Sequence, residues 1–376
     1  MVMAAESGRL GGVLNSDDQH NSQPRWLLPS LRADPALISA ITVCTRPFRA
    51  QGPRVEIERL GDRSVVHNYG HGGSGWSLSW GSGAMASDLA LGTGERAIAV
   101  IGCGALGLTC ALLLQRAGAR VTIYARELPP QVRSSLANGV WTPDSRICLA
   151  PHATAAFKAR WQQMARRSWQ IYQTYLGSPG NPVELFDRYT LTDDRTPAQA
   201  VADRRPPFAS LSAELLSDLY PATVSYAAGQ HPLGQRTVQV VPWLLFNLST
   251  YTDRLLTEFR DRGGKIEIAE FHELSQLQTV RERTLVNATG YGARKLFGDE
   301  SVVPIRGQLT RMAIQDDIRY GLFYRNASFI PRRDGLVFQV LGENDYYGYD
   351  DDTTVPDRAE AELAVTTIAQ LFTATG

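Results

Sequence analysis

Apolar residues between positions 97 and 125 are spaced first as in a strand, then as in a helix, then again as in a strand. Residues 97–101 form a short apolar run, and residues 106–116 keep an apolar helical face that ends before Gly118, a residue typical of a helix C-terminus. Residues 120–125 predict the second strand. This order predicts one βαβ unit of a parallel sheet.

The chain before this unit predicts a few strands and one helix. Strand-like segments are separated by turn residues, and a glycine-rich stretch at 70–75 precedes an apolar segment of helical character. The expected elements are strands at 40–44, 54–58 and 64–67, a turn at 61–62 and a helix at 77–91.

The rest of the chain has weaker periodicity. Trp, Met and Tyr residues at helical spacing are interpreted as core faces of helices. We expect helices at 161–176, 244–259 and 358–372, strands at 285–288, 307–312 and 336–341, a loop at 197–207 and a solvated loop at 343–352.

Composition narrows the class of protein. A chain of 376 residues exceeds one ordinary core, which favours two domains. Basic and acidic residues number 38 each, so the net charge is zero and gives no reason to expect a nucleic-acid partner. A hydrophobic fraction of 43% excludes a disordered chain. No apolar run approaches the ~20 residues of a membrane-spanning helix.

The N-terminus and the cysteines indicate a cytoplasmic protein. Residues 1–30 are polar, are expected to be a disordered extension, and lack the pattern of a secretory signal. Four cysteines without a CxxC motif are too few for a disulfide framework, which fits a reducing compartment.

A GxGxxG motif follows the strand at 97–101. Its first glycine permits a tight turn, its second lets a pyrophosphate approach the backbone, and its third lets helix and strand pack closely, while the helix N-terminus attracts phosphate. The motif comprises Gly102, Cys103, Gly104, Ala105, Leu106 and Gly107. Its position between strand and helix predicts nucleotide binding.

The residues at the end of the next strand are compatible with two different cofactors. Arg126 occupies the usual ribose-binding position and Glu127 follows it. Arg126 would recognise a 2′-phosphate in an NADP enzyme. Alternatively, Arg126 contacts the adenosine half of FAD and Glu127 binds a ribose hydroxyl.

Several motifs resemble those of the D-amino-acid oxidase family. The most specific is Val-His-Asn-Tyr-Gly-His-Gly-Gly-Ser-Gly-Trp at 66–76, followed by Trp80-Gly81. The others are Thr45-Arg46-Pro47, Val-Asn-Ala-Thr-Gly at 286–290, Arg306-Gly307-Gln308, Arg-Glu-Leu-Pro at 126–129 and Asn-Gly-Val-Trp-Thr-Pro at 138–143. The resemblance covers most of residues 35–375 and implies FAD as the cofactor.

The order of these motifs differs from that of the family. The family's chain closes on the motif at 66–76, whereas here this motif precedes the GxGxxG strand. The sequence therefore resembles a circularly permuted member, in which residues 92–96 join the helix at 77–91 to the strand at 97–101. A rival interpretation is that the first ninety or so residues complete a neighbouring protomer by swapping.

The resemblance implies particular site residues. It implies that Arg46 and Tyr324 bind the substrate carboxylate and that the backbone of Gly73 binds the substrate amine. A guanidinium suits a carboxylate because it offers two parallel N–H donors. Vertebrate members have a second tyrosine, but this chain has Ser328 at the corresponding position, so that tyrosine is absent. The implied cofactor-binding residues, besides the glycine motif, Arg126 and Glu127, are Ser134, Ser135, Asn138, Gly139, Gly72, Gly73, Ser74, Gly75, Trp76, Ser77, Thr289 and Gly290.

Hydride transfer from a neutral amine requires no acid or base side chain. His67 and His71 are therefore interpreted as structural, with His67 at a strand end and His71 bonded to backbone in the glycine loop. No His, Cys or Asp cluster has metal-ligand spacing, so no metal is expected, and no GxSxG motif occurs.

Together these features predict an α/β fold with a Rossmann-like FAD-binding domain and a second, α+β substrate domain built on a mixed sheet. The expected boundaries are 31–150 plus 265–305 for the FAD-binding domain and 151–264 plus 306–376 for the substrate-binding domain, with parts of the helices shared. The expected activity is oxidation of a D-amino acid to a 2-oxo acid, ammonia and hydrogen peroxide.

Alternatives are a dehydrogenase, a glycine- or sarcosine-type amine oxidase, and a nucleotide-binding protein without turnover. The expected partners are an amino acid and molecular oxygen, with no nucleic acid and no membrane, and a homodimer is left open.

Overall fold

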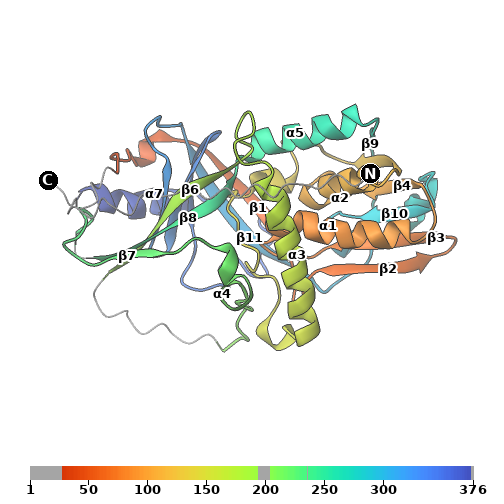
Figure 1. The fold of residues 1–376 in the computed structure, drawn as a ribbon, viewed down its shortest axis with the longest axis horizontal. Helices are drawn as coiled ribbons and strands as arrows, with labels where there is room; N and C mark the ends of the chain where they lie inside the picture. Colours follow the sequence, from red (N-terminus) through yellow and green to blue (C-terminus); the bar gives the residue numbers. More distant parts are fainter. Residues whose placement is uncertain (1–27, 194–203, 235, 374–376) are drawn as a thin grey trace, which may run out of the picture.

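The computed structural model describes residues 28–193, 204–234 and 236–373. Its strands form two sheets that occupy opposite halves of the molecule (Figure 1). The six-stranded sheet lies with helices α1 and α2 on the right of this view, and the eight-stranded sheet lies with helix α7 on the left. None of the helices in the described ranges is long and apolar enough to cross a lipid bilayer.

The six-stranded sheet has a parallel core. Its order is β2 (Arg54–Leu60), β3 (Arg63–Tyr69), β10 (Thr284–Asn287), β4 (Ala97–Ile101), β5 (Arg120–Ala125) and β9 (Lys265–Ile268). All neighbouring pairs are parallel except the β2–β3 hairpin at one edge. Strands far apart in the sequence therefore end at the same edge of the sheet.

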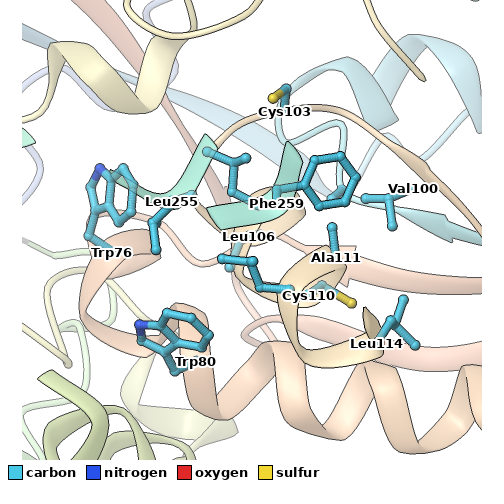
Figure 2. Packing of buried hydrophobic residues seen from close by; sticks show 14 of the residues in the cluster. Trp76, Trp80, Val100, Cys103, Leu106, Cys110, Ala111, Leu114, Leu255 and Phe259 are labelled. Carbon is cyan, nitrogen blue, oxygen red and sulfur yellow. The ribbon is translucent and has the colours of Figure 1, made fainter. Parts of the chain in front are cut away.

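Helices α1 (Gly75–Leu91) and α2 (Ala105–Arg116) pack on this sheet and on each other. Helix α3 (Ala155–Gln173) packs against α1, and α5 (Leu248–Asp261) packs against α2. Figure 2 shows Leu255 and Phe259 of α5 beside Leu106 and Ala111 of α2, in the largest apolar cluster of the molecule.

The eight-stranded sheet is mixed. Its order is β1 (Ile38–Arg49), β11 (Val302–Met312), β14 (Gly335–Val340), β13 (Ala327–Arg332), β12 (Tyr320–Tyr324), β6 (Val183–Asp193), β8 (Arg236–Phe246) and β7 (Val224–Tyr226). Among its described strands, β12 and β6 pair in parallel and the other neighbours pair antiparallel. Helix α7 (Arg358–Thr373) packs on β14, β13 and β11, and the short helices α4 (Ser212–Leu215) and α6 (Gly292–Leu296) lie in connections.

The first residues described contact the eight-stranded sheet. Leu31 is buried in the same apolar cluster as Leu371 of α7, and the Tyr320 hydroxyl donates to the carbonyl oxygen of Pro29. The predicted extension otherwise lies outside the described residues, as does most of the predicted loop at 197–207.

The βαβ unit is confirmed, and four other predictions need correction. The helix predicted at 244–259 begins only at Leu248, because Leu244 and Leu245 end strand β8. An apolar run alone does not separate a buried strand from a helix. The strand predicted at 40–44 extends through Arg49. Strands β6, β7, β8, β9, β12 and β13 were not predicted.

The fourth correction concerns the loop at 343–352. It is not simply solvated, because the Tyr346 ring is buried against Phe208 with ring centroids 4.7 Å apart. Its hydroxyl donates to the carbonyl oxygen of Pro206 over 2.5 Å. Aromatic side chains in an acidic segment thus cover the body of the protein.

Residues 38–91 pack within their own chain and join both sheets. Strand β1 pairs with β11 over its whole length, so it lies in the eight-stranded sheet, although the expected boundaries place it in the cofactor domain. Strand β3 pairs with β10, and β10 in turn pairs with β4. The segment before the GxGxxG strand is therefore an integral part of both halves.

Candidate active site

A cavity of about 860 Å³ opens between the two sheets. Its floor is formed where parallel strands end, by Ile101 as the last residue of β4, Ala125 as the last residue of β5 and Ala288 directly after β10. Phe323 of β12 and Gln339 of β14 reach it from the eight-stranded sheet. A crevice at the carboxyl ends of parallel strands is the usual ligand site of such sheets, and this volume is in the range of cofactor pockets.

The GxGxxG turn shapes one end of this cavity. Gly102 has φ +108°, and a Cβ there would lie 2.5 Å from the carbonyl oxygen of Ala288. Gly107 does not line the cavity but packs against the turn, since a Cβ on it would lie 2.1 Å from the carbonyl oxygen of Gly102. Gly104, Ala105 and Leu106 line the cavity. Gly104 has no side chain that could cap α2, and the Ala105 N–H donates to Ser134 Oγ over 3.1 Å. The positive end of the α2 dipole faces the cavity at this point.

The glycine loop at 70–75 shapes the cavity further along. Gly72 has φ +56°, and a Cβ there would lie 2.0 Å from the carbonyl oxygen of Arg146. The Gly73 N–H donates to the carbonyl oxygen of Ser145 over 2.9 Å, which leaves the Gly73 carbonyl as its free backbone group. Helix α1 begins at Gly75 without a side-chain cap, and Gly75 and Trp76 line the cavity. Gly73 and Gly104 thus share one crevice.

Acidic side chains surround Arg126 at the outer rim. Its guanidinium lies 3.4 Å from Glu127 and 3.1 Å from Glu270, and its side chain is half exposed. A 2′-phosphate would meet both carboxylates, which argues against the NADP interpretation. A ribose hydroxyl can donate to a carboxylate at this position.

Arg46 lies inside strand β1 rather than after it. Its Nη1 donates to the carbonyl oxygen of Arg306 over 3.0 Å, and its guanidinium lies over Gly307, where a Cβ would be 2.3 Å from Nη2. Only glycine at 307 leaves room for this arginine. Arg46 is half-buried and lines the cavity.

Tyr324 does not line the cavity, so its predicted role in carboxylate binding is wrong. The side chain is 1% exposed in the apolar cluster beneath α7, and its hydroxyl donates to Asp193 over 3.0 Å. Its neighbour Phe323 faces the cavity instead. Side chains alternate along a strand, so a shift of one residue in an alignment reverses the face.

Several other predicted residues support the cavity without lining it. Ser77 Oγ accepts from the Thr142 N–H over 2.8 Å, and Ser74 Oγ donates to the carbonyl oxygen of Ser145 over 3.1 Å. Ser135 is buried, and a Cβ on Gly139 would lie 2.5 Å from the carbonyl oxygen of Phe246. The predicted residues that do line the cavity, besides those already described, are Glu127, Ser134, Asn138, Thr289 and Gly290.

Arg146 lines the cavity beside Arg46 and was not among the predicted site residues. It has φ +50°, and its Nε donates to the carbonyl oxygen of Asp345 over 2.6 Å. Burial, together with the charge of Arg46, lowers the pKa of Arg146 to about 10. Arg146 lies in a turn without helical or strand periodicity, so no pattern marks it.

The two histidines have side-chain partners. Nε2 of His71 lies 2.8 Å from Ser82 Oγ, rather than on backbone as expected, and burial lowers the pKa of His71 to about 3. His67 is buried with Nδ1 3.1 Å from Asn287. Within the described ranges, no three His, Cys, Asp or Glu side chains gather in an arrangement that could hold a metal ion.

Comparison with known proteins gives related enzymes. The D-amino-acid oxidase of Rubrobacter xylanophilus is 27% identical over 267 residues, which cover 70% of this chain and 73% of that protein. The D-amino-acid oxidase of Streptomyces coelicolor is 31% identical over 215 residues, or 56% of this chain and 58% of that protein.

Solved structures share the fold. Iminodiacetate oxidase from Chelativorans sp. BNC1 matches with a TM-score of 0.51 and 16% identity over 73% of this chain and 79% of that one. L-Proline dehydrogenase from P. horikoshii matches with a TM-score of 0.51 and 14% identity over 74% and 78%.

The family model described as "DAO: FAD dependent oxidoreductase" matches residues 97–375, beginning at the first residue of β4. This match covers well over half of the chain and shows the enzyme class and its cofactor, FAD. The chain belongs to the DAO family of FAD-dependent oxidoreductases.

Proposed function

We propose that this enzyme oxidatively deaminates D-amino acids, with transfer of a hydride from the substrate Cα, to give a 2-oxo acid, ammonia and hydrogen peroxide. The observation that supports this most is one cavity, within one chain, that joins the N-terminus of α2 to the guanidinium of Arg46. A dinucleotide site and a carboxylate site therefore face each other.

The described residues fit FAD. The Gly104 turn and the first N–H groups of α2 would hold the pyrophosphate, and Glu127 would accept from a ribose hydroxyl. The Gly72 loop and the N-terminus of α1 would contact the isoalloxazine end, where a positive helix dipole stabilises negative charge. When bound, FAD supplies the hydride acceptor, N5, and the electrons that reduce molecular oxygen.

The substrate would be oriented by Arg46 and the Gly73 carbonyl. Arg46 would bind the α-carboxylate with parallel N–H donors. Because the Gly73 N–H is already bonded, its carbonyl would accept from the substrate amine. The positive charges of Arg46 and Arg146 disfavour a second cation nearby and so favour the neutral amine that hydride transfer needs. His71, with its low pKa, is too weak a base for this task.

We also infer a rearranged chain order. The family model begins at β4, whereas residues 38–91 add β1 to one sheet and β2 and β3 to the other, and residues of β1, of the glycine loop and of α1 line the cavity. A five-residue link, 92–96, joins α1 to β4. This arrangement supports a circularly permuted chain in which the segment that usually closes the fold stands first.

The direct test of the function is a substrate screen of the FAD-loaded protein with D- and L-amino acids, glycine and sarcosine, in which oxygen uptake and peroxide are measured together. We expect D-amino acids to be consumed with one peroxide per oxygen. Flavin reduction without peroxide would instead indicate a dehydrogenase, preference for glycine or sarcosine would indicate an amine oxidase, and no turnover would indicate a passive nucleotide binder.

Arg46→Ala should lower kcat/KM for D-amino acids by about 100-fold or more, because a charge-assisted pair is lost, while FAD stays bound. Arg46→Lys is the matched control, since it keeps the charge but loses the parallel donors, and it should recover part of the activity. Unchanged kinetics in Arg46→Ala would remove this residue from the substrate site.

A further inference from the structure

A second, smaller cavity of about 160 Å³ adjoins the main one. The two share Arg46, Arg146, Gln339 and Leu341 in their linings. Arg306 also lines the smaller cavity, but its charge is neutralised by the buried Glu360 carboxylate 2.7 Å away. Arg46 and Arg146 therefore carry the positive charge of the lining that the two cavities share.

Arg46 and Arg146 have no acidic partner within the part of the chain that the structure describes, since no carboxylate there lies within 4.0 Å of either guanidinium. Each is held instead by a backbone carbonyl, that of Arg306 for Arg46 and that of Asp345 for Arg146. The Asp345 side chain acts on Arg146 only at longer range, and burial with the neighbouring charge of Arg46 is the larger effect. Asp345 also lines the smaller cavity, but neither guanidinium has a direct ion-pair partner among the described residues.

The turn that carries Arg146 is fixed on both sides. The Asp144 carboxylate accepts from the N–H groups of Leu211 and Ser212 over 2.9 and 2.8 Å. On the other side, the absence of a side chain at Gly72 lets the Arg146 carbonyl approach closely. These contacts hold Arg146 at φ +50°, a conformation that an arginine adopts only when its surroundings impose it.

We propose that the substrate carries two carboxylates, as an acidic D-amino acid does, with Arg46 on the α-carboxylate and Arg146 on the side-chain carboxylate. This rests on the proposed D-amino-acid oxidation. A substrate with one carboxylate would leave one half-buried guanidinium uncompensated, whereas two carboxylates match both charges. Gln339, at the junction of the two cavities, offers an amide donor to the same group.

The first test compares kcat/KM for D-aspartate and D-asparagine, and for D-glutamate and D-glutamine, since each pair differs by an amide for a carboxylate. We expect the acidic member to be preferred by about 10- to 100-fold, the range of one charge-assisted pair. In Arg146→Asn the preference should fall to about one, because kcat/KM for the acidic substrate falls much more than kcat/KM for its amide or for D-alanine. Asparagine is chosen because it tolerates positive φ. Arg146→Lys should restore part of the preference.

The second test needs no turnover. Binding of succinate is compared with that of succinamate, its half-amide, by calorimetry on the FAD-loaded protein. Tighter succinate binding that is lost in Arg146→Asn supports the subsite even if no D-amino acid is oxidised, so failure of the proposed function is recognised separately.

Two results would overturn the inference. One is equal binding of succinate and succinamate together with equal kcat/KM for D-aspartate and D-asparagine in the wild-type protein. The other is an Arg146→Asn variant in which kcat/KM for D-alanine and D-aspartate fall by the same factor, because Arg146 would then share the α-carboxylate with Arg46.

Discussion

Glycines without a side chain, and one histidine with a buried side chain, shape the wall of the cavity. Gly72 and Gly102 both have positive φ, and a Cβ on either would lie 2.0 or 2.5 Å from a backbone oxygen of another segment. His71, next to Gly72, is buried and bonds to Ser82 of helix α1. The glycine loop is thus fixed by backbone contact on one side and by a neutral imidazole on the other.

The buried His71 makes stability depend on pH. Its pKa is about 3 in the folded protein and near 6.5 in the unfolded chain. Below pH ~6.5 the unfolded chain therefore binds a proton that the folded protein does not bind, and the folded state loses stability as the pH falls toward 3. One such group lowers the free energy of unfolding by about 2 kcal/mol between pH 7 and pH 5. Denaturant unfolding of wild type and His71→Gln at both pH values should show a smaller loss in the variant by about that amount.

The exposed His152 provides the control. His152→Gln should lose as much stability between the two pH values as the wild-type protein does. If His71→Gln loses as much stability as wild type over this interval, His71 is not buried as a neutral group.

At the scale of elements, helix α1 is the one that unites the fold. Twelve of its seventeen residues are buried, so it lacks the polar face of a surface helix. Its Gly81 lies against the backbone of α3, where a Cβ would be 2.1 Å from the carbonyl oxygen of Met164. Its Gly83 faces α2, where the nearest contact of a Cβ would be 3.3 Å.

Gly81→Ala should therefore destabilise the protein by about 2 kcal/mol or more, because α1 and α3 must separate. Gly83→Ala, in the same helix, should change stability by less than about 1 kcal/mol, since the gain in helix propensity offsets a tight contact. Denaturant unfolding of the two variants measures both changes. Equal effects would show that α1 and α3 do not approach as closely as described.

The success of sequence-based prediction also varies by element. Strands β4 and β5 and the start of α2 follow from local pattern, because an apolar run, glycines and a helix stop agree there. Strand β12 does not, since Tyr320 to Tyr324 is a short apolar run with a glycine and no turn signal that marks its ends. The same ambiguity explains why Tyr324 rather than Phe323 was expected in the cavity.

The candidate site shows the same division. The glycine motifs and Arg46 belong to recognisable local strings, and the structure brings them to one cavity. Gln339 and Phe323 come from segments without such motifs, and the pairing of distant strands places them there. Arg146 comes from a turn without a motif, and the close approach of Gly72 to that turn places it there. Local sequence thus predicts the cofactor side of the cavity better than the substrate side.

The whole molecule depends on an N-terminal segment that enters both sheets. If the chain is a circular permutation, restoring the other order should preserve the fold. A rearranged chain would begin at Ala97, run to Thr373, continue through a Gly-Ser linker into Leu28 and end at Gly92. Leu28 and Phe372 both pack against the cluster beneath α7, so the linker can be short.

We expect the rearranged protein to bind FAD in a one-to-one ratio and to unfold within a few degrees of the wild-type protein, as measured by flavin absorbance and calorimetry. The contacts of β1 with β11 and of β3 with β10 are the same in either order. If the wild-type chain is soluble but the rearranged chain is insoluble and binds no FAD, the chain is not a circular permutation.

The central claim is that one chain holds FAD between its two glycine turns with its reactive face toward Arg46. Anaerobic addition of a D-amino acid, and separately of its L-enantiomer, to the purified FAD-loaded protein tests it most directly. We expect the long-wavelength flavin absorbance to be lost with the D-amino acid and to persist with the L-enantiomer. If that absorbance persists with every D-amino acid tried, or is lost with the L-enantiomer alone, FAD and Arg46 are not arranged for oxidation of a D-amino acid.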